Sequence, residues 1–237
     1  MIDGVIFDKD GTLFDFRRTW GEWSARLLHE LSGGDEARAV RLGGFIGFDL
    51  PSREFAPDSP VIAETVDRIA ARLVPHLPGR NIAGLIEEMN DLSARASLAE
   101  VVPLRPCLSA LRSRGLRLGL VTNDAEAPAR AHLDQAGVAD LFDFVAGFDS
   151  GYGAKPGPGP LLAFAAAQGL APGRVAMVGD SLHDLHAGRA AGMRPIAVLT
   201  GIAAHDDLAP HAEIVLPDIG GLAAWLDSTA PGKAGAA

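Results

Sequence analysis

In the second part of the chain, short apolar runs alternate with segments of helical periodicity. After Pro103 and Pro106, the apolar runs lie at residues 116–122, 144–146, 175–179, 195–199 and 214–216. The spacing of apolar residues around them predicts helices at 108–113, 128–136, 161–168, 185–191 and 222–226. Strands that alternate with helices indicate a parallel sheet with helices on both faces, which is a Rossmann-like, doubly wound α/β fold.

A long helical segment separates the first strand from the others. Residues 5–7 (Val-Ile-Phe) form an apolar run that suits the centre of a sheet buried on both faces. From about residue 15 to about residue 97 the pattern is helical, with a loop rich in Gly, Pro and Phe at 42–57 and no clear strand. We therefore expect an α/β core made of residues 1–14 and 98–227, an inserted all-helical cap domain at 15–97, and a disordered tail at 228–237.

Composition limits the possible partners and compartments. The net charge of −9 comes without a basic run of the kind that nucleic-acid-binding proteins carry. No apolar stretch approaches the roughly 18 residues of a membrane span, and the N-terminus does not have the pattern of a signal peptide. The single cysteine, Cys107, excludes an internal disulfide and a Cys-rich zinc site. We expect a cytoplasmic protein with no nucleic-acid or membrane partner, either a monomer or a homodimer.

Two aspartates directly follow the first predicted strand. Asp8 and Asp10 stand in the run Asp-Lys-Asp-Gly-Thr, and Gly11 allows a sharp turn and a close approach of the backbone to an anion. One carboxylate can attack phosphorus, and the other can protonate the leaving oxygen and later activate water. An acidic turn without function is the competing interpretation.

Further polar residues follow other predicted strands. Thr122 and Asn123 end the second core strand, where a hydroxyl and backbone amides suit phosphate oxygens, although both residue types are also common helix caps. Lys155 lies in a Gly-rich loop and could neutralise charge on a nucleophile and a phosphoryl group, or be only a solvated charge. Asp180 and Asp184 would share one face of a helix and offer oxygen ligands for Mg²⁺, or simply form an acidic helix start. Because ligands bind beyond the carboxyl ends of parallel strands, we expect these residues to meet.

The order and spacing of these clusters resemble those of the haloacid dehalogenase superfamily of phosphohydrolases. The insertion after the first cluster resembles the C1 type of cap, and the segment from Lys155 to Gly192 is most similar to phosphoglycolate phosphatase-like members. The resemblance implies a magnesium-dependent phosphatase that acts on a small-molecule phosphate ester through an aspartyl-phosphate.

The resemblance also implies a role for each matching residue. Asp8 would be the nucleophile, and Asp10 the general acid and base. Thr122 and Asn123 would hold the phosphoryl group, and Lys155 would orient Asp8 and offset charge. The implied residues of the magnesium site are Asp8, Asp10 (through its backbone carbonyl), Asp180 and Asp184.

One position of the first cluster departs from the family pattern. Lys9 stands where capped members usually have an apolar residue, and we expect its side chain to point away from the phosphate. In the cap, Arg17, Arg18, Trp20, Arg53 and the loop 43–45 are candidates for substrate contact. The tryptophans could equally form the cap core, and the arginines could be solvated surface.

Three other functions use related residues. A phosphomutase would return the phosphate to its sugar, a dehalogenase would attack carbon without magnesium, and a binding protein would keep the fold without turnover. Asp10 and the pair Asp180 and Asp184 favour chemistry at phosphorus. Phosphoglycolate, a sugar phosphate and a nucleoside monophosphate all remain open as substrates.

Overall fold

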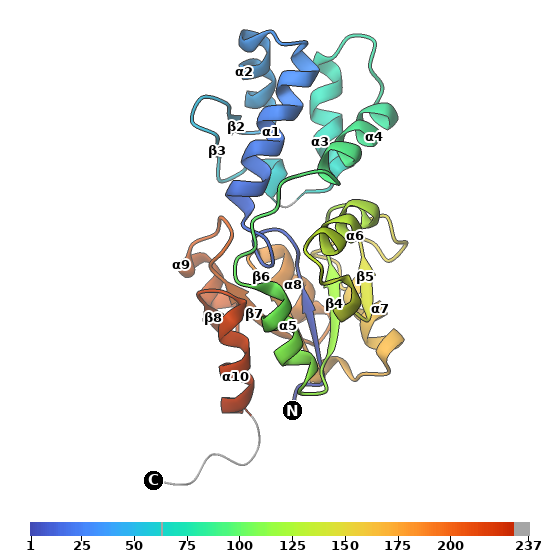
Figure 1. Ribbon diagram of the computed structural model, residues 1–237, viewed down its shortest axis with the longest axis vertical. Coiled ribbons are helices and arrows are strands. Elements are labelled where there is room, and N and C mark those ends of the chain that lie inside the picture. Colours follow the sequence, from blue (N-terminus) through green and yellow to red (C-terminus); the bar gives the residue numbers. More distant parts are fainter. Residues whose placement is uncertain (63, 230–237) are drawn as a thin grey trace.

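The computed structural model describes residues 1–62 and 64–229, which form an α/β core and a helical cap (Figure 1). The core sheet contains β1 (Gly4–Phe7), β4 (Arg117–Val121), β5 (Phe144–Ala146), β6 (Val175–Gly179), β7 (Arg194–Val198) and β8 (Ile214–Leu216). All neighbours pair in parallel, in the order β5-β4-β1-β6-β7-β8. The predicted doubly wound α/β fold is confirmed, with β1 between β4 and β6.

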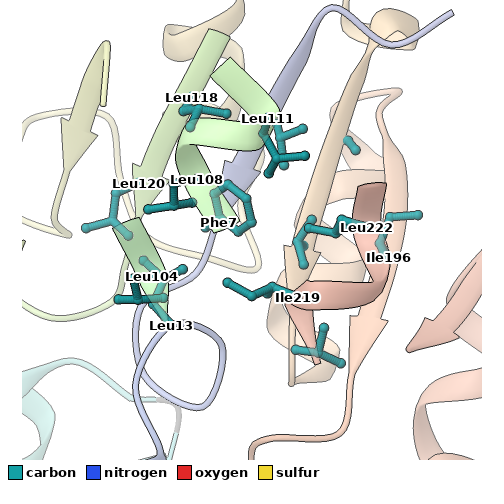
Figure 2. Close-up of a cluster of buried hydrophobic side chains, with 14 of the residues drawn as sticks. Phe7, Leu13, Leu104, Leu108, Leu111, Leu118, Leu120, Ile196, Ile219 and Leu222 are labelled. Carbon is teal, nitrogen blue, oxygen red and sulfur yellow. The ribbon is translucent and has the colours of Figure 1, made fainter. Parts of the chain in front are cut away.

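Helices cover both faces of this sheet. On one face, α5 (Leu104–Arg112), α6 (Glu126–Gln135) and α10 (Leu222–Thr229) pack on alternate residues of the strands, such as Phe7 and Leu118 (Figure 2). On the other face, α7 (Gly159–Gln168) and α8 (Leu182–Ala190) contact the intervening residues, such as Ile6. The short α9 (His205–Leu208) packs beside α8. This alternation follows from the two-residue period of a strand that is buried on both faces.

The described part of the predicted tail belongs to a helix. Helix α10 continues through Ser228 and Thr229, so these two residues were wrongly placed in the disordered tail. The remainder of that prediction, 230–237, lies outside the described residues.

The cap contains α1 (Phe16–Ser32), α2 (Glu36–Phe45), α3 (Val66–Leu73) and α4 (Ile82–Ser93) around its own apolar core. The segment 42–57, predicted as a loop, instead holds the end of α2 and a two-residue antiparallel ladder of β2 (Phe48–Asp49) and β3 (Glu54–Phe55). Phe48 and Phe55 face each other there, with ring centroids 4.8 Å apart. Burial of these two rings orders a segment that has too few residues for a visible strand pattern.

Single-turn 3₁₀ helices occupy several connections, at Pro60–Ile62, Val74–His76, Ala139–Leu141, Pro172–Arg174, Ala209–His211 and Ile219–Gly221. None of the helices in the described residues combines the length and the apolar character that crossing a membrane requires.

Two linkers run side by side between core and cap. The N–H of Asp15 donates to the carbonyl of Ala99 at 2.8 Å, and the N–H of Val101 donates to the carbonyl of Leu13 at 3.1 Å. The chain therefore leaves and re-enters the core at the same place, above the carboxyl ends of the strands.

Candidate active site

The separate clusters of the sequence meet at the carboxyl ends of three neighbouring strands. Asp8 follows β1, Thr122 follows β4 and Asp180 follows β6. Because β1 pairs with both of the other strands, these three residues lie side by side. All seven predicted site residues line one cavity: Asp8, Asp10, Thr122, Asn123, Lys155, Asp180 and Asp184.

Lys155 joins two of the aspartates. Its Nζ donates to Asp8 Oδ1 at 2.5 Å and to Asp184 Oδ1 at 2.6 Å, and its side chain is almost completely buried. Asn123 holds the lysine backbone from both sides: the Lys155 N–H donates to Asn123 Oδ1, and Asn123 Nδ2 donates to the Lys155 carbonyl. The peptide bond between Lys155 and Pro156 is cis. The Asn123 side chain thus positions the lysine loop.

Three buried carboxylates crowd around this one ammonium group. Asp8, Asp180 and Asp184 each offer an oxygen within 4.8 Å of the others. Burial, opposed by Lys155 and assisted by Asp184 and Asp10, raises the pKa of Asp8 from 3.8 to about 7. Burial and the charges of Asp8 and Asp184 likewise raise the pKa of Asp180 well above its ordinary value. When all three carboxylates are ionised, their negative charge exceeds what Lys155 offsets, and for this reason their protonated forms are favoured.

Glycines allow the carboxylate of Asp180 to sit this deep. Gly11 has φ +79°, and a Cβ there would lie 2.4 Å from Asp180 Oδ2. A Cβ on Gly201 would lie 1.6 Å from the same oxygen. The Thr200 hydroxyl donates to the Gly11 carbonyl at 2.6 Å and joins the two loops. Our sequence analysis missed Thr200 and Gly201, whose signal was their position directly after β7.

Asp184 is fixed by the start of α8 as well as by Lys155. Its Oδ2 accepts hydrogen bonds from the Ser181 N–H at 3.1 Å and the Ser181 hydroxyl at 2.6 Å. Both bonds run from Ser181 to Asp184, and within the capping box at the start of α8 they satisfy the otherwise unpaired N–H of Ser181. The same contacts that begin the helix therefore orient a carboxylate towards the cavity.

Lys9 does not line the cavity, yet it contacts a residue that does. Its fully buried Nζ lies 3.1 Å from Asp10 Oδ2, 2.8 Å from Asp124 Oδ2 and 3.0 Å from His132 Nδ1. It also lies 5.3 Å from the centre of the Trp20 ring. Burial alone would lower the pKa of Lys9, but Asp10 and Asp124 outweigh that effect and raise it. Lys9 is therefore a buried cation that holds one oxygen of Asp10.

His132 extends this network into the cap. Since a lysine ammonium can only donate, His132 Nδ1 accepts from Lys9, and its Nε2–H donates to the carbonyl of Ser93 in α4 at 2.6 Å. Burial and the neighbouring Lys9 lower the pKa of His132, which is consistent with a neutral ring. The other Asp10 oxygen, Oδ1, is buried and has no hydrogen-bond partner among the described residues.

The cap residues proposed for substrate contact fall in different places. Trp20 lines the cavity. Arg17, Arg18 and Arg53 do not line it but line a separate depression with Ser97–Ala99, which favours the alternative interpretation that they are surface residues. Phe45, in the predicted contact loop 43–45, stacks on His76 away from the cavity. Arg17 and Arg18 are consecutive residues near the start of α1, and only the packing of this helix decides which of its faces meets the cavity.

Fold and site together define a capped α/β enzyme with buried carboxylates at its strand ends. The chain matches the family of haloacid dehalogenase-like hydrolases over residues 2–192, and it belongs to that family.

Two relatives and one solved structure show how far the similarity extends. The chain is 33% identical to a phosphoglycolate phosphatase of Rhodospirillum rubrum, with 98% of this chain and 94% of the relative covered. It is 39% identical to a phosphoglycolate phosphatase of Escherichia coli, covering 84% of this chain and 82% of the relative. A crystal structure of a predicted phosphoglycolate phosphatase from Haemophilus somnus shares the fold, with a TM-score of 0.73, 18% identity, and coverage of 95% of this chain and 98% of the other.

Proposed function

We propose that this protein is a magnesium-dependent, phosphoglycolate phosphatase-like enzyme that hydrolyses a small-molecule phosphate monoester through an aspartyl-phosphate. The observation that carries the proposal is the ion-paired cluster of Lys155 with Asp8 and Asp184, next to Asp180, in one cavity. The names of the two relatives support chemistry at phosphorus.

The carboxylate cluster suits a magnesium ion. Asp8, Asp180 and Asp184 supply the hard oxygen ligands that Mg²⁺ prefers, and their surplus negative charge favours a divalent cation. The carboxylate of Asp10 is instead held by Lys9, so its proposed share in the metal site is limited to its backbone carbonyl. When bound, the ion would supply charge stabilisation for the phosphoryl oxygens.

The first chemical step transfers the phosphoryl group to Asp8. A carboxylate oxygen of Asp8 attacks phosphorus, the bond from phosphorus to the ester oxygen breaks, and Asp10 gives its proton to the departing alcohol. Lys155, held beside Asp8, offsets the charge that accumulates there. The Thr122 hydroxyl accepts from the Asp124 N–H at 3.1 Å, which leaves its proton for a phosphoryl oxygen.

The second step returns the enzyme to its starting state. Asp10, now a carboxylate, takes a proton from water while the water oxygen attacks phosphorus. The bond between Asp8 and phosphorus breaks, so inorganic phosphate leaves and both aspartates regain their original states. Asp10 Oδ1, buried and without a described partner, is the oxygen we assign to both proton transfers.

The decisive experiment measures phosphate release from a panel of phosphate monoesters, with Mg²⁺ and with a chelator. Asp8→Asn keeps the shape of the side chain but removes the nucleophile. Asp3→Asn is the matched control, because Asp3 lies just before the other end of β1 and pairs with Arg174 on the surface. We expect magnesium-dependent release that Asp8→Asn reduces by at least about 10⁴-fold and Asp3→Asn leaves unchanged.

Other results would indicate the alternative functions. An isomeric sugar phosphate in place of free phosphate would indicate a phosphomutase. Turnover that survives in Asp8→Asn would contradict the proposed nucleophile. Binding of every ester without turnover would indicate a binding protein. Acid quenching during turnover should trap a phosphoryl group on the peptide that contains Asp8.

A further inference from the structure

The cap side of the active-site cavity is mainly an apolar wall, to which Glu64, Asn90 and Ser93 add polar groups. The apolar side chains that the cap contributes are Phe16, Trp20 and Trp23 of α1, Val61 and Ile62 of the turn before α3, Val66 and Ile69 of α3, and Met89 of α4. These side chains face the catalytic groups of the core across the cavity. The leaving group of a phosphate ester would point towards this wall, because a phosphoryl group in reach of Asp8 would lie at the strand ends.

Positive charge is scarce around this cavity. The described lining residues include no arginine, and their one lysine is Lys155, which is already paired with Asp8 and Asp184. The one acidic lining residue that the cap contributes is Glu64, and His183 lies on the core side beside Asp184. Lys9 is completely buried and paired with Asp10 and Asp124. A carboxylate on the leaving group would therefore meet apolar side chains, Glu64 and the neutral polar groups of Asn90 and Ser93, with no cation to pair with it.

We infer that the substrate carries an uncharged, largely apolar leaving group, such as an aromatic or branched alcohol, in preference to an anionic one. The inference rests on the proposed phosphatase function and names the class of ester for the same site. It separates this chain from what the names of its relatives suggest, because glycolate is a carboxylate.

Three buried polar atoms of this cavity could orient the leaving group through a hydrogen bond. The indole N–H groups of Trp20 and Trp23 and the side-chain oxygen of Asn90 are buried and have no hydrogen-bond partner among the described residues. All three residues line the cavity. A neutral hydroxyl or carbonyl on the leaving group could pair with one of them, which a purely aliphatic alcohol cannot do.

The test compares four esters that all release a primary alcohol, so that their intrinsic reactivities are similar. They are phosphoglycolate, ethyl phosphate, benzyl phosphate and 3-hydroxybenzyl phosphate. We expect kcat/KM for benzyl phosphate to exceed that for ethyl phosphate by about tenfold or more, and phosphoglycolate to be the poorest. The 3-hydroxyl should lower KM further.

A charge introduced into the wall provides the second arm. Asn90→Lys would place a cation in the cavity, and Asn90→Met is the matched control of similar length without charge. We expect the ratio of kcat/KM for phosphoglycolate to that for ethyl phosphate to be about tenfold higher in Asn90→Lys than in Asn90→Met, and equal ratios in the two variants would contradict the inference.

The results on these esters distinguish a failure of this inference from a failure of the proposed function. If phosphoglycolate is hydrolysed as well as ethyl phosphate or better by the wild type, the inference is overturned while the phosphatase assignment stands. If none of the four esters, nor any other member of the monoester panel, releases phosphate, the proposed function itself is wrong. A flat response across the three uncharged esters would also overturn the apolar preference.

Discussion

The side chain of Lys9 connects the active site with the contact between core and cap, because it binds both Asp10 and His132. It occupies a position that the family pattern fills with an apolar residue, and it is buried as completely as one. Its ammonium group binds Asp10 and Asp124 and donates to the neutral His132 ring. A charge that is buried among matched partners can be tolerated, but removal of one partner is costly.

Substitution of Lys9 tests whether it positions Asp10, the proposed general acid. Lys9→Met keeps the aliphatic stem but leaves Asp10 Oδ2 without its ion pair. We expect kcat to fall roughly 10- to 100-fold with little change in KM, because substrate contacts stay intact while the proton donor loses its orientation. Steady-state kinetics on the best ester would measure this, and a thermal melt would show that the variant is folded. A kcat within about twofold of the wild type would show that Asp10 needs no such support.

At the scale of elements, the loops after the strands decide the site. Loops after β1, β4 and β6 carry the predicted residues, and the loop after β7 supplies Thr200 and Gly201, which shape the space around Asp180. The start of α8 contributes its capping box to the orientation of Asp184. The strands and helices fix the ends of these loops. Close contacts between the loop backbone and the side chains, as at Gly11 and Gly201, then decide where a carboxylate such as that of Asp180 lies.

The glycine after β7 provides a test at this scale. Gly201→Ala would place a methyl group into the Asp180 carboxylate, so we expect weaker magnesium binding and a fall in kcat/KM of about tenfold or more. Gly44→Ala is the control, because that position lies in α2 and a Cβ there meets open space. Activity titrated against Mg²⁺ would measure both variants. Equal magnesium dependence in the two would contradict the steric role of Gly201.

At the scale of the whole molecule, the cap and the core share one polar network. Ser93 of α4 accepts from His132 of the core through its carbonyl, and Trp20 of α1 lies over Lys9. Two backbone hydrogen bonds also join the two linkers that connect the core to the cap. The cap therefore contacts the same network that orients Asp10, and the cavity lies between them.

The buried carboxylates make the stability of the metal-free protein depend on pH. The pKa of Asp8 is about 7 in the fold and near 3.8 when unfolded, so the folded state binds its proton more tightly. Stability from this group is present at low pH and is lost as pH rises from about 4 to 7, on the order of 1–3 kcal/mol. Chemical denaturation with a chelator should show this loss, and Asp8→Asn should reduce it.

Magnesium supplies the control for that measurement. An ion that binds only the folded protein should restore stability at pH 8 by an amount that grows with its concentration. Parallel profiles of stability against pH for the wild type and Asp8→Asn would contradict the assignment of the effect to this cluster.

The sequence by itself determined the alternation of strands and helices, the position of the inserted cap, and the residues that gather at the strand ends. These features depend on local periodicity and on short motifs, which can be read without knowing the packing. Only the tertiary structure decided that Lys9 binds Asp124, 115 residues away, and that the arginines of α1 face away from the cavity. It alone placed an apolar cap wall opposite the carboxylates, because contacts between distant segments depend on which helix face the packing buries.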